Sequence, residues 1–382
     1  MHVAIDYTAA VRQGAGIGRY TRNLIRALAD LDSGNQYTLF VAGGWGQGDG
    51  LGAWRSNFRV RTVPLTDRVM HILWQRLRIP VPMQVITGAI DLFHSPDFVL
   101  PPVGRTPAIL TVHDLSFLRV PEYFVPGFRD YLEEAVSRGV GRACHILADS
   151  NSTRSDLIKL MGVGPDKVTV LYPGVEHRFS RVRDADTLAR VTERYELPER
   201  FILGLSTLQP RKNFDGLINA FRQLLADESH REGSDLHLVI CGGMGWMYKD
   251  MLETVKRYGL DDRIHFPGFV SDEDLPALYS LASVFAFPSW YEGFGLPVLE
   301  AMACGTPVVA ADNSSLPEVV GRSGLMVDAS DRDQLVAALS RLLTDHDLRT
   351  ALVSAGRVHA AQFTLTKAAE DLLALYKRFA VD

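Results

Sequence analysis

The stretch Ser289-Trp-Tyr-Glu292-Gly-Phe-Gly-Leu-Pro297-Val-Leu-Glu300 places two carboxylates on either side of a glycine-rich turn. Proline suits the first turn of a helix, because its missing N–H would have no partner there. We therefore predict a helix over Pro297–Ala303, followed by an apolar strand from Val308. Glu292 then lies on the loop before this helix, and Glu300 lies on its early turns.

The turn between the two carboxylates offers backbone N–H groups at the positive end of a helix dipole. Such a turn attracts anions, and the flanking acids accept hydrogen bonds from hydroxyls. A nucleotide sugar combines phosphates and hydroxyls in one molecule, so it is a ligand of the right kind. The alternative is that Glu292 and Glu300 are ordinary solvated acids. The turn consists of Gly293, Phe294, Gly295 and Leu296.

Outward from this stretch, the chain repeats a strand, a turn and a helix from end to end. This alternation predicts an α/β fold with parallel sheets that carry helices on both faces. A chain of 382 residues exceeds what one hydrophobic core usually organises, so we expect two doubly wound domains. The boundary is expected between Tyr172 and Pro198, a charged, turn-rich stretch without a sustained apolar period.

The apolar runs and their turn residues give the expected elements of both halves. Strands are predicted over Val3–Asp6, Tyr37–Val41, Arg59–Val63, Asp91–His94, Ala108–Val112, Ile146–Ala148, Phe201–Leu205, Leu236–Cys241, Ile264–Phe266, Val284–Phe287 and Val308–Ala310. Further helices are predicted over Ile17–Leu31, Pro126–Val140, Ser150–Met161, Asn213–Ala226, Met247–Tyr258, Glu273–Leu281, Asp331–Leu343, Asp347–Gln362 and Leu365–Phe379.

Two basic residues follow the strand predicted over Phe201–Leu205, in Thr207-Leu-Gln-Pro-Arg211-Lys212-Asn213. Two cations at the mouth of a strand–helix turn can hold a diphosphate, Arg through a bidentate fork and Lys as a point charge. Adjacent basic residues are also common on ordinary surfaces. Arg211 and Lys212 therefore indicate a diphosphate site only in combination with the downstream acid pair.

Together, these motifs resemble retaining glycosyltransferases of family 4, whose Glu-x7-Glu motif has the spacing of Glu292 and Glu300. The resemblance continues through Leu299–Ala310 and Ser315–Val319 and covers nearly the whole chain. Within the family, Ala15-Gly-Ile-Gly-Arg-Tyr20 and the stretch from Gly268 to Pro276 look most like bacterial mannosyltransferases of polysaccharide and O-antigen assembly.

The resemblance implies the GT-B fold, in which two Rossmann-like domains face a central cleft and the final helix crosses back to the first domain. We therefore expect an N-terminal acceptor-side domain over residues 1–178 and a nucleotide-sugar-binding domain over residues 179–363. Residues 364–382 are expected to form the returning helix. By the same resemblance, Arg211 and Lys212 clamp the donor diphosphate. Glu300 binds the ribose hydroxyls, and Glu292 with the turn Gly293–Leu296 holds the donor sugar.

Two positions in the first half complete the expected site. Gly14-Ala-Gly16-Ile-Gly18 opens the first long helix, and the resemblance implies that Gly16 faces the donor phosphates. A purely structural turn is the alternative for these glycines. His113 ends the strand Ala108–Val112 and matches a family histidine that touches the donor sugar; a structural histidine is the alternative. The neighbouring Asp114 either fixes the imidazole tautomer or caps the following turn, and we favour the cap.

The net charge of −5 argues against generic nucleic-acid binding. His and Cys show no metal-ligand spacing and no Asp-x-Asp pair follows a strand, so we expect no metal and no cofactor. The chain starts without a signal-peptide pattern. The cysteines fit small buried residues of a reduced compartment, which favours a cytoplasmic enzyme. They are Cys144, Cys241 and Cys304.

The segment Val69–Ile79 combines apolar residues and a tryptophan with three arginines, of which Arg68 directly precedes it and Arg76 and Arg78 lie near its end. A basic amphipathic segment can rest at the inner face of a membrane, where a lipid-linked acceptor is held. The favoured alternative is that its apolar residues pack on the sheet while the arginines stay in water.

We therefore expect a metal-independent, retaining transferase that moves a hexose from a nucleoside-diphosphate sugar to a hydroxyl of a glycan or lipid-linked sugar. The resemblance favours mannose and GDP-mannose, and it implies catalytic roles for His113 and Glu292. In the family, the leaving diphosphate itself takes the acceptor proton, so Glu292 is expected to position the sugar and stabilise charge. The alternatives are a nucleotide-sugar epimerase or phosphorylase of the same fold, and an inactive sugar-binding scaffold.

Overall fold

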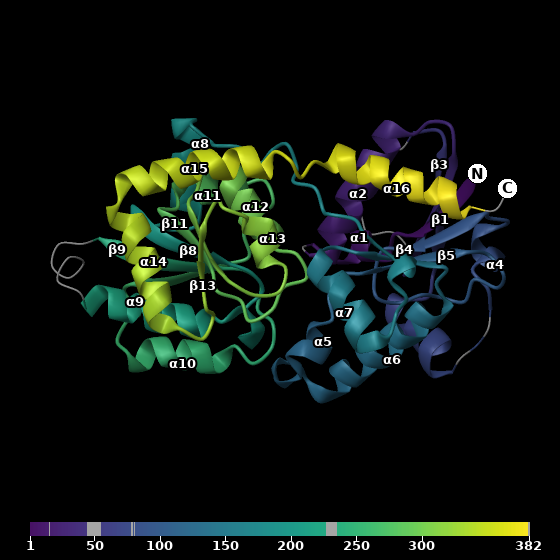
Figure 1. The fold of residues 1–382 in the computed structure, drawn as a ribbon, viewed down its shortest axis with the longest axis horizontal. Coiled ribbons are helices and arrows are strands. Elements are labelled where there is room, and N and C mark those ends of the chain that lie inside the picture. Colours follow the sequence, from purple (N-terminus) through teal and green to yellow (C-terminus); the bar gives the residue numbers. More distant parts are fainter. Residues whose placement is uncertain (15, 44–54, 78, 80, 227–234, 381–382) are drawn as a thin grey trace. The chain divides into compact units, whose positions relative to one another are not determined.

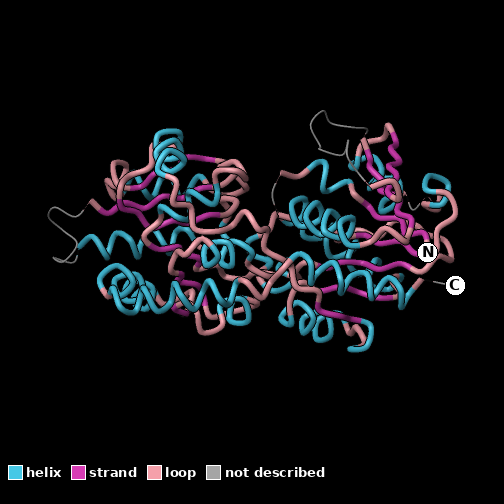
Figure 2. Tube along the Cα trace, turned by 90° about the horizontal axis from the view of Figure 1, so that it is seen from above, coloured by secondary structure: helices cyan, strands magenta, loops and turns pink. Residues whose placement is uncertain are grey.

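The computed structural model of the protein describes residues 1–14, 16–43, 55–77, 79, 81–226 and 235–380. The chain divides into two compact units. Unit 1 comprises Met1–Gly174 and Phe363–Asp382, and unit 2 comprises Val175–Gln362. In both units the strands form a central parallel sheet and the helices surround it (Figures 1 and 2). The predicted α/β fold with two doubly wound units is therefore confirmed.

The sheet of unit 1 has seven parallel strands in the order β3-β2-β1-β4-β5-β6-β7. The central strands β4, β5 and β6 are buried along their whole length, which is why their sequences are mostly apolar and do not alternate between apolar and polar residues. The strands are β1 (His2–Asp6), β2 (Gln36–Ala42), β3 (Phe58–Val63), β4 (Leu92–Ser95), β5 (Ala108–Val112), β6 (His145–Ala148) and β7 (Val168–Val170). The α-helices are α1 (Thr8–Arg12), α2 (Ile17–Leu31), α3 (Asp67–His71), α4 (Gln84–Thr87), α5 (Ser116–Arg119), α6 (Pro126–Arg142), α7 (Asn151–Met161) and α16 (Leu365–Phe379). Shorter turns are η2 (Ile72–Arg76), η3 (Pro121–Tyr123) and η4 (Pro165–Lys167).

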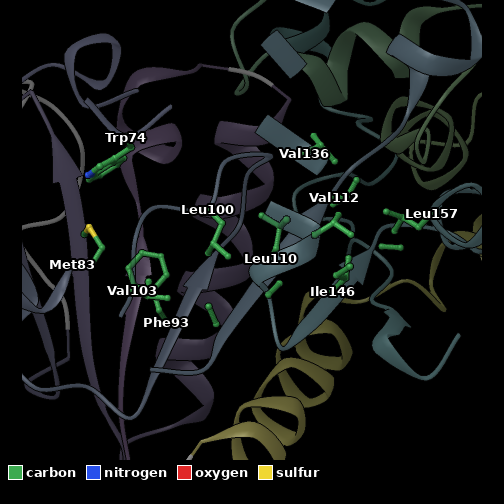
Figure 3. Packing of buried hydrophobic residues seen from close by; sticks show 14 of the residues in the cluster. Trp74, Met83, Phe93, Leu100, Val103, Leu110, Val112, Val136, Ile146 and Leu157 are labelled. Carbon is green, nitrogen blue, oxygen red and sulfur yellow. The ribbon is translucent and has the colours of Figure 1, made fainter. Parts of the chain in front are cut away.

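Two apolar clusters cover the two faces of this sheet. One face packs against Trp74, Met83 and Val136, as Figure 3 shows around Leu110 and Ile146. The other face is covered by α2 and by the C-terminal helix α16, which lie side by side (Figure 1). The predicted return of the last helix to the first unit is therefore confirmed. Its buried residues are Ala368, Ala369, Leu372, Leu375 and Tyr376.

Unit 2 has a six-stranded parallel sheet in the order β10-β9-β8-β11-β12-β13. Its strands are β8 (Arg200–Leu205), β9 (Leu236–Cys241), β10 (Ile264–Gly268), β11 (Val284–Phe287), β12 (Val308–Ala311) and β13 (Leu325–Val327). Its helices are α8 (Ala185–Arg194), α9 (Phe214–Ala226), α10 (Lys249–Arg257), α11 (Leu275–Leu281), α12 (Leu296–Ala303), α13 (Leu316–Val320), α14 (Arg332–Thr344) and α15 (His346–Ala360), with the turn η5 (Pro210–Lys212). Among the helices of the described ranges, none combines the length and apolar composition needed to cross a membrane.

Two predictions about local structure are wrong. The stretch after Tyr172 contains helix α8, which was not predicted because its sequence is largely polar and Val191 is its one buried residue. Arg190 and Arg194 hold α8 in place instead, through ion pairs of 2.9 and 3.0 Å to the buried carboxylate of Asp274. Cys144 was expected in the core, but it is exposed at the start of β6.

Candidate active site

The charged residues predicted in unit 2 meet where the strand order of its sheet reverses, between β8 and β11. Ligands of doubly wound sheets bind in the crevice that such a reversal opens at the carboxyl ends of the strands. Arg211 and Lys212 lie in η5, shortly after β8, and Glu292 follows β11. The backbone joins the two loops as well, because Trp290 N donates to the carbonyl of Arg211 at 2.9 Å.

Lys212 and Glu292 form a buried ion pair. Lys212 Nζ lies 2.7 Å from Glu292 Oε1 and 2.9 Å from Oε2, and the two side chains are only 9% and 8% exposed. Arg211 Nη1 lies 3.4 Å from Glu292 Oε2 and also donates to the carbonyl of Tyr291. The ammonium of Lys212 sits 5.5 Å from the ring centre of Phe287, the last residue of β11. The structure thus brings the predicted clamp and the first glutamate together.

The three charges leave the site with a net charge of +1, since two cations face one carboxylate. Burial alone would raise the pKa of Glu292, but the charges of Lys212 and Arg211 hold that pKa below its ordinary value. Glu292 is therefore ionised at neutral pH. A buried site with one excess cation suits an anionic ligand such as a diphosphate.

Two buried polar atoms beside this pair lack a hydrogen-bond partner within the described part of the chain. They are Arg211 Nε, a donor, and Gln209 Oε1, an acceptor. Buried polar groups of native proteins are nearly always bonded, and exceptions mark sites that a ligand or water completes. Both atoms lie on the loop after β8, where the sequence predicts the diphosphate.

The loop that carries Glu292 is fixed by two serines on the turn after β12. Ser314 Oγ accepts from Glu292 N at 2.9 Å. Ser315 Oγ contacts the carbonyls of Glu292 and Phe294 at 3.0 and 2.6 Å. Gly295 has φ of 114°, a conformation that favours glycine, and it is the N-cap of α12. Gly293, Phe294 and Gly295 are buried and Leu296 is half-buried, so the predicted turn is packed into the protein directly after Glu292.

Glu300 lies on α12 and is 2% exposed. Its Oε2 accepts a hydrogen bond from the hydroxyl of Tyr279 on α11 at 3.0 Å. A buried carboxylate supported by a tyrosine hydroxyl is held in one orientation, as a hydrogen-bond acceptor for ligand hydroxyls must be. Tyr279 is a supporting residue that no sequence motif indicated.

In unit 1, the glycine-rich stretch is shaped by close packing around helices α1 and α2. Gly16 is the N-cap of α2 with φ of 58°, and a Cβ built on it would meet open space. A Cβ on Gly18 would lie 2.1 Å from the carbonyl oxygen of Gln13, so a side chain is excluded there. Arg22 also ties the turn together by donating to the carbonyls of Ala10 and Gln13. The positive φ of Gly16 and the close packing at Gly18 thus explain these two glycines on structural grounds. A contact of Gly16 with phosphate stays a prediction.

His113 directly follows β5 and is held between two acceptors. Nδ1 lies 2.7 Å from Asp149 Oδ2, and Nε2 lies 3.0 Å from the carbonyl oxygen of Pro96. Both ring nitrogens therefore donate, which requires the protonated ring. Burial alone would lower the pKa of His113, but the charge and hydrogen bond of Asp149, with contributions from Asp97 and the Pro96 carbonyl, raise it to about 9. At neutral pH His113 is a fixed cation rather than a proton acceptor.

The partner of His113 was not indicated by the sequence motifs. Asp114 accepts hydrogen bonds from the backbone N–H and the hydroxyl of Ser116, so it caps the next turn as favoured. Asp149, which follows buried strand β6, orients the imidazole instead. A charged residue directly after an apolar strand was the available signal, because carboxyl ends of neighbouring parallel strands share one edge. The ring of Tyr20 packs edge-on against His113, with centroids 4.9 Å apart.

The model of the family described as Glycosyltransferase Family 4 matches residues 14–179, and that of Glycosyl transferases group 1 matches residues 189–359. The chain is 32% identical over 371 residues to O-antigen chain mannosyltransferase B of Escherichia coli, covering 95% of this chain and 96% of that protein. The chain belongs to glycosyltransferase family 4.

A second relative of this glycosyltransferase carries a different name. D-inositol 3-phosphate glycosyltransferase of Salinispora arenicola is 34% identical over 314 residues, which is 76% of this chain and 69% of that protein. Among solved structures, Anabaena Alr3699/HepE in complex with UDP-glucose superposes with a TM-score of 0.74 at 18% identity, covering 99% of each chain. That likeness establishes the GT-B fold of the glycosyltransferase.

Proposed function

We propose that this glycosyltransferase moves a mannosyl group from GDP-mannose to a hydroxyl of a glycan or lipid-linked sugar, with retention of configuration and without a divalent metal. The observation that carries the proposal is the buried cluster of Arg211, Lys212 and Glu292 at the strand reversal of unit 2. Its excess positive charge matches a diphosphate, and its carboxylate matches a sugar hydroxyl or the positive charge that develops at the anomeric carbon.

In this proposal, Arg211 and Lys212 bind the diphosphate, and Glu300 accepts hydrogen bonds from the ribose. Glu292 and the turn Gly293–Leu296 hold the sugar. The bond from the anomeric carbon to the diphosphate oxygen breaks, and the acceptor oxygen bonds to the same face of that carbon. The leaving diphosphate oxygen takes the acceptor proton, while the protein stabilises charge. His113 is proposed to contact the donor sugar as a fixed cation, and Gly16 to approach its phosphates.

The choice of mannose rests on the relative named O-antigen chain mannosyltransferase B, which matches along nearly the whole chain. A nucleotide-sugar donor is supported by the fold neighbour that was solved with UDP-glucose. The relative named D-inositol 3-phosphate glycosyltransferase supports a second acceptor class, a phosphorylated cyclitol. Both acceptor classes therefore belong in the test.

The test is a transfer assay with GDP-mannose or UDP-glucose as donor and a mannose oligosaccharide or inositol phosphate as acceptor. We expect transfer from GDP-mannose to the oligosaccharide, an α-linked product by NMR, and undiminished turnover in excess EDTA. Metal independence is expected because Arg211 and Lys212 supply the positive charge, and retention is expected because the acceptor attacks the face that the diphosphate leaves. A β-linked product, or activity lost to EDTA and restored by Mg²⁺ or Mn²⁺, contradicts the mechanism. Turnover of the nucleotide sugar without any acceptor would favour an epimerase.

Replacing Glu300 with alanine is expected to weaken GDP binding about tenfold to a hundredfold, because a hydrogen bond to a charged group contributes roughly 1.5–3 kcal/mol. Isothermal titration calorimetry measures this directly. Tyr279→Phe is the matched control, since it removes the supporting hydroxyl and keeps the carboxylate, so its effect should be smaller. If folded Glu300→Ala protein binds GDP with unchanged affinity, Glu300 does not contact the nucleotide.

We also propose a peripheral contact with anionic lipid through the segment around α3 and η2. Trp74 and Met70 are buried, which agrees with core packing, but Ile72, Leu77 and Ile79 are 37%, 61% and 38% exposed. Leu73 packs against the core cluster, as the alternative expects, whereas Ile72, Leu77 and Ile79 do not follow that expectation. Arg68 and Arg76 are exposed in the same segment, while Arg78 lies outside the described residues.

This contact predicts binding to vesicles that contain phosphatidylglycerol, because exposed apolar groups insert while arginines attract the anionic headgroups. Co-sedimentation at low and high salt measures the binding. The double change Arg68→Ser and Arg76→Ser should abolish it, whereas the same change at Arg349 and Arg357 of α15 in unit 2 should not. Protein that stays in the supernatant at low salt excludes this surface.

A further inference from the structure

The backbone of Ser314, on the turn between β12 and α13, adopts a conformation that is strained for every residue type except glycine. Its φ is 49°, in the left-handed region, where the Cβ of an ordinary residue lies too close to a backbone carbonyl oxygen. Strained residues persist where the surrounding structure holds them, and they cluster at functional sites. The other non-glycine residues of the described ranges with positive φ are Glu196, Asn213 and Met247.

The hydroxyl of Ser314 makes two hydrogen bonds that a glycine lacks. Ser314 Oγ accepts from the backbone N–H of Glu292 at 2.9 Å and donates to Asn313 Oδ1 at 2.9 Å. Asn313 Nδ2 in turn donates to the carbonyl of Ser289 at 3.0 Å. Ser314 and its neighbour therefore hold both ends of the segment Ser289–Glu292, which ends in the buried carboxylate of the candidate site.

The loop after β8 holds the same region from a second strained residue. Asn213 directly follows Lys212, has φ of 55° and donates through Nδ2 to the carbonyl of Pro288 at 3.0 Å. Two of the four strained residues thus adjoin the buried ion pair, Asn213 through Lys212 and Ser314 through Glu292. Asparagine tolerates the left-handed region better than most residues, so Ser314 is the stronger exception.

A turn with only a structural role at this position is expected to contain glycine, which adopts positive φ without strain. Glycine in place of Ser314 would leave the second anchor of the loop intact, because Ser315 Oγ contacts the carbonyls of Glu292 and Phe294. It would remove the hydrogen bond to the Glu292 N–H. The serine therefore keeps the backbone of Glu292 fixed at the expense of a strained turn. A charged group that is fixed beforehand needs no reorganisation during a reaction.

We propose that Ser314 is a positioning residue of the transferase, which keeps a strained backbone and thereby fixes the segment that presents the Glu292 carboxylate to the donor sugar. The proposal rests on the proposed function, in which Glu292 holds the sugar and stabilises charge. It deepens that function by assigning the placement of the carboxylate to a residue outside the Glu-x7-Glu motif. Ser314 acts through the backbone of Glu292 and does not touch the donor. Stability and activity are therefore opposed at this position.

The first measurement compares the melting temperatures of Ser314→Gly and Ser314→Ala in the full chain. Both changes remove the hydroxyl, but only glycine relieves the strain, so the glycine variant should melt about 2–4 °C higher. The matched control is the pair Glu196→Gly and Glu196→Ala, because Glu196 has φ of 51° and is exposed. These two variants should show the same difference in melting temperature and the kcat of wild type.

The second measurement is kcat for transfer from GDP-mannose. Both Ser314 variants should lower kcat about twofold to tenfold, the fold-change that corresponds to one neutral hydrogen bond, and leave GDP affinity by calorimetry unchanged. Because Ser314 acts through Glu292, Ser314→Ala should cause no further loss of kcat in Glu292→Gln protein. A residue that only stabilised the turn would not show this dependence on the carboxylate.

Hydrogen exchange of the peptide 288–294 gives a measurement that needs no turnover. The Glu292 N–H should exchange faster in both Ser314 variants than in wild type, because its acceptor is gone. Unchanged exchange, wild-type kcat in Ser314→Gly, a glycine variant that melts no higher than the alanine variant, or an equal loss of kcat in Glu292→Gln protein overturns the positioning role. If wild-type protein transfers nothing from GDP-mannose, the proposed function fails, and the exchange measurement alone decides whether Ser314 holds the backbone of Glu292.

Discussion

Replacing Lys212 with methionine is expected to lower the free energy of unfolding of unit 2 by up to about 3–5 kcal/mol, the usual cost of removing one partner of a buried ion pair, because Glu292 would keep only the 3.4 Å contact with Arg211. Lys212 and Glu292 are 9% and 8% exposed and 2.7 Å apart, so water cannot take over the lost interaction. Urea unfolding followed by circular dichroism measures the change. The double replacement Lys212→Met and Glu292→Gln should recover a large part of the loss, because it removes the orphaned charge as well.

The matched control is the exposed pair of Lys367 and Asp371, which are also 2.7 Å apart but 63% and 47% exposed. Exposed ion pairs contribute roughly 0–1 kcal/mol, so Lys367→Met should change stability little. If Lys212→Met lowers the free energy of unfolding no more than Lys367→Met does, the buried pair does not stabilise the fold. A ligand could then bind its charges without a loss of stability.

The same pair predicts a direction for the pH dependence of stability. Lys212 and Arg211 hold the pKa of Glu292 in the folded protein below its ordinary value, in spite of burial. The contribution of the pair is therefore fully present above the unfolded-state pKa of about 4.3 and is lost as the pH falls through the lower folded-state pKa. Glu292→Gln should reduce this decrease in the free energy of unfolding at acidic pH.

The sequence predicted most of the fold because buried parallel strands are continuous apolar runs and long helices carry clear caps. Strands β5, β9 and β11 and helices α2 and α16 have the predicted bounds. The three-residue strands β7 and β13 were not predicted, because three residues are too few to show a period. Helix α8 was missed for a different reason, because it buries little apolar surface and Arg190 and Arg194 hold it by ion pairs.

The members of the candidate site could be predicted, but their pairings could not. Lys212 and Glu292 were expected to bind different parts of the donor, and the structure shows them bonded to each other. That contact depends on β8 and β11 being neighbours, and strand order is not written in local sequence. Asp149 and His113 meet for the same reason, because β5 and β6 are neighbours. Motifs identify residues that can take part in binding or catalysis, and the order of the strands in the sheet determines which of those residues are in contact.

Replacing Glu292 with glutamine is expected to lower kcat about 10²-fold to 10³-fold, the usual effect of removing one group that stabilises transition-state charge. GDP affinity should stay within about threefold of wild type or increase, because the change frees Lys212 and Arg211 from their internal partner. Loss of a residue that bound the ground state and the transition state equally would instead raise KM and leave kcat unchanged. Rapid-quench turnover and calorimetry with GDP separate the two.

The control for this change is Glu273→Gln, an identical substitution at an exposed position before α11, which should leave both kcat and GDP affinity unchanged. The position of Glu292 also allows a sharper distinction. If Glu292 were a nucleophile, wild-type protein mixed with donor alone would gain the mass of one hexose on the peptide that contains Glu292, and Glu292→Gln would not. We expect no such adduct, because Lys212 and Arg211 hold both carboxylate oxygens in charge-assisted contacts that lower their nucleophilicity. An adduct at Glu292, or full activity of Glu292→Gln, would show that the carboxylate does not act as an electrostatic partner in the transfer.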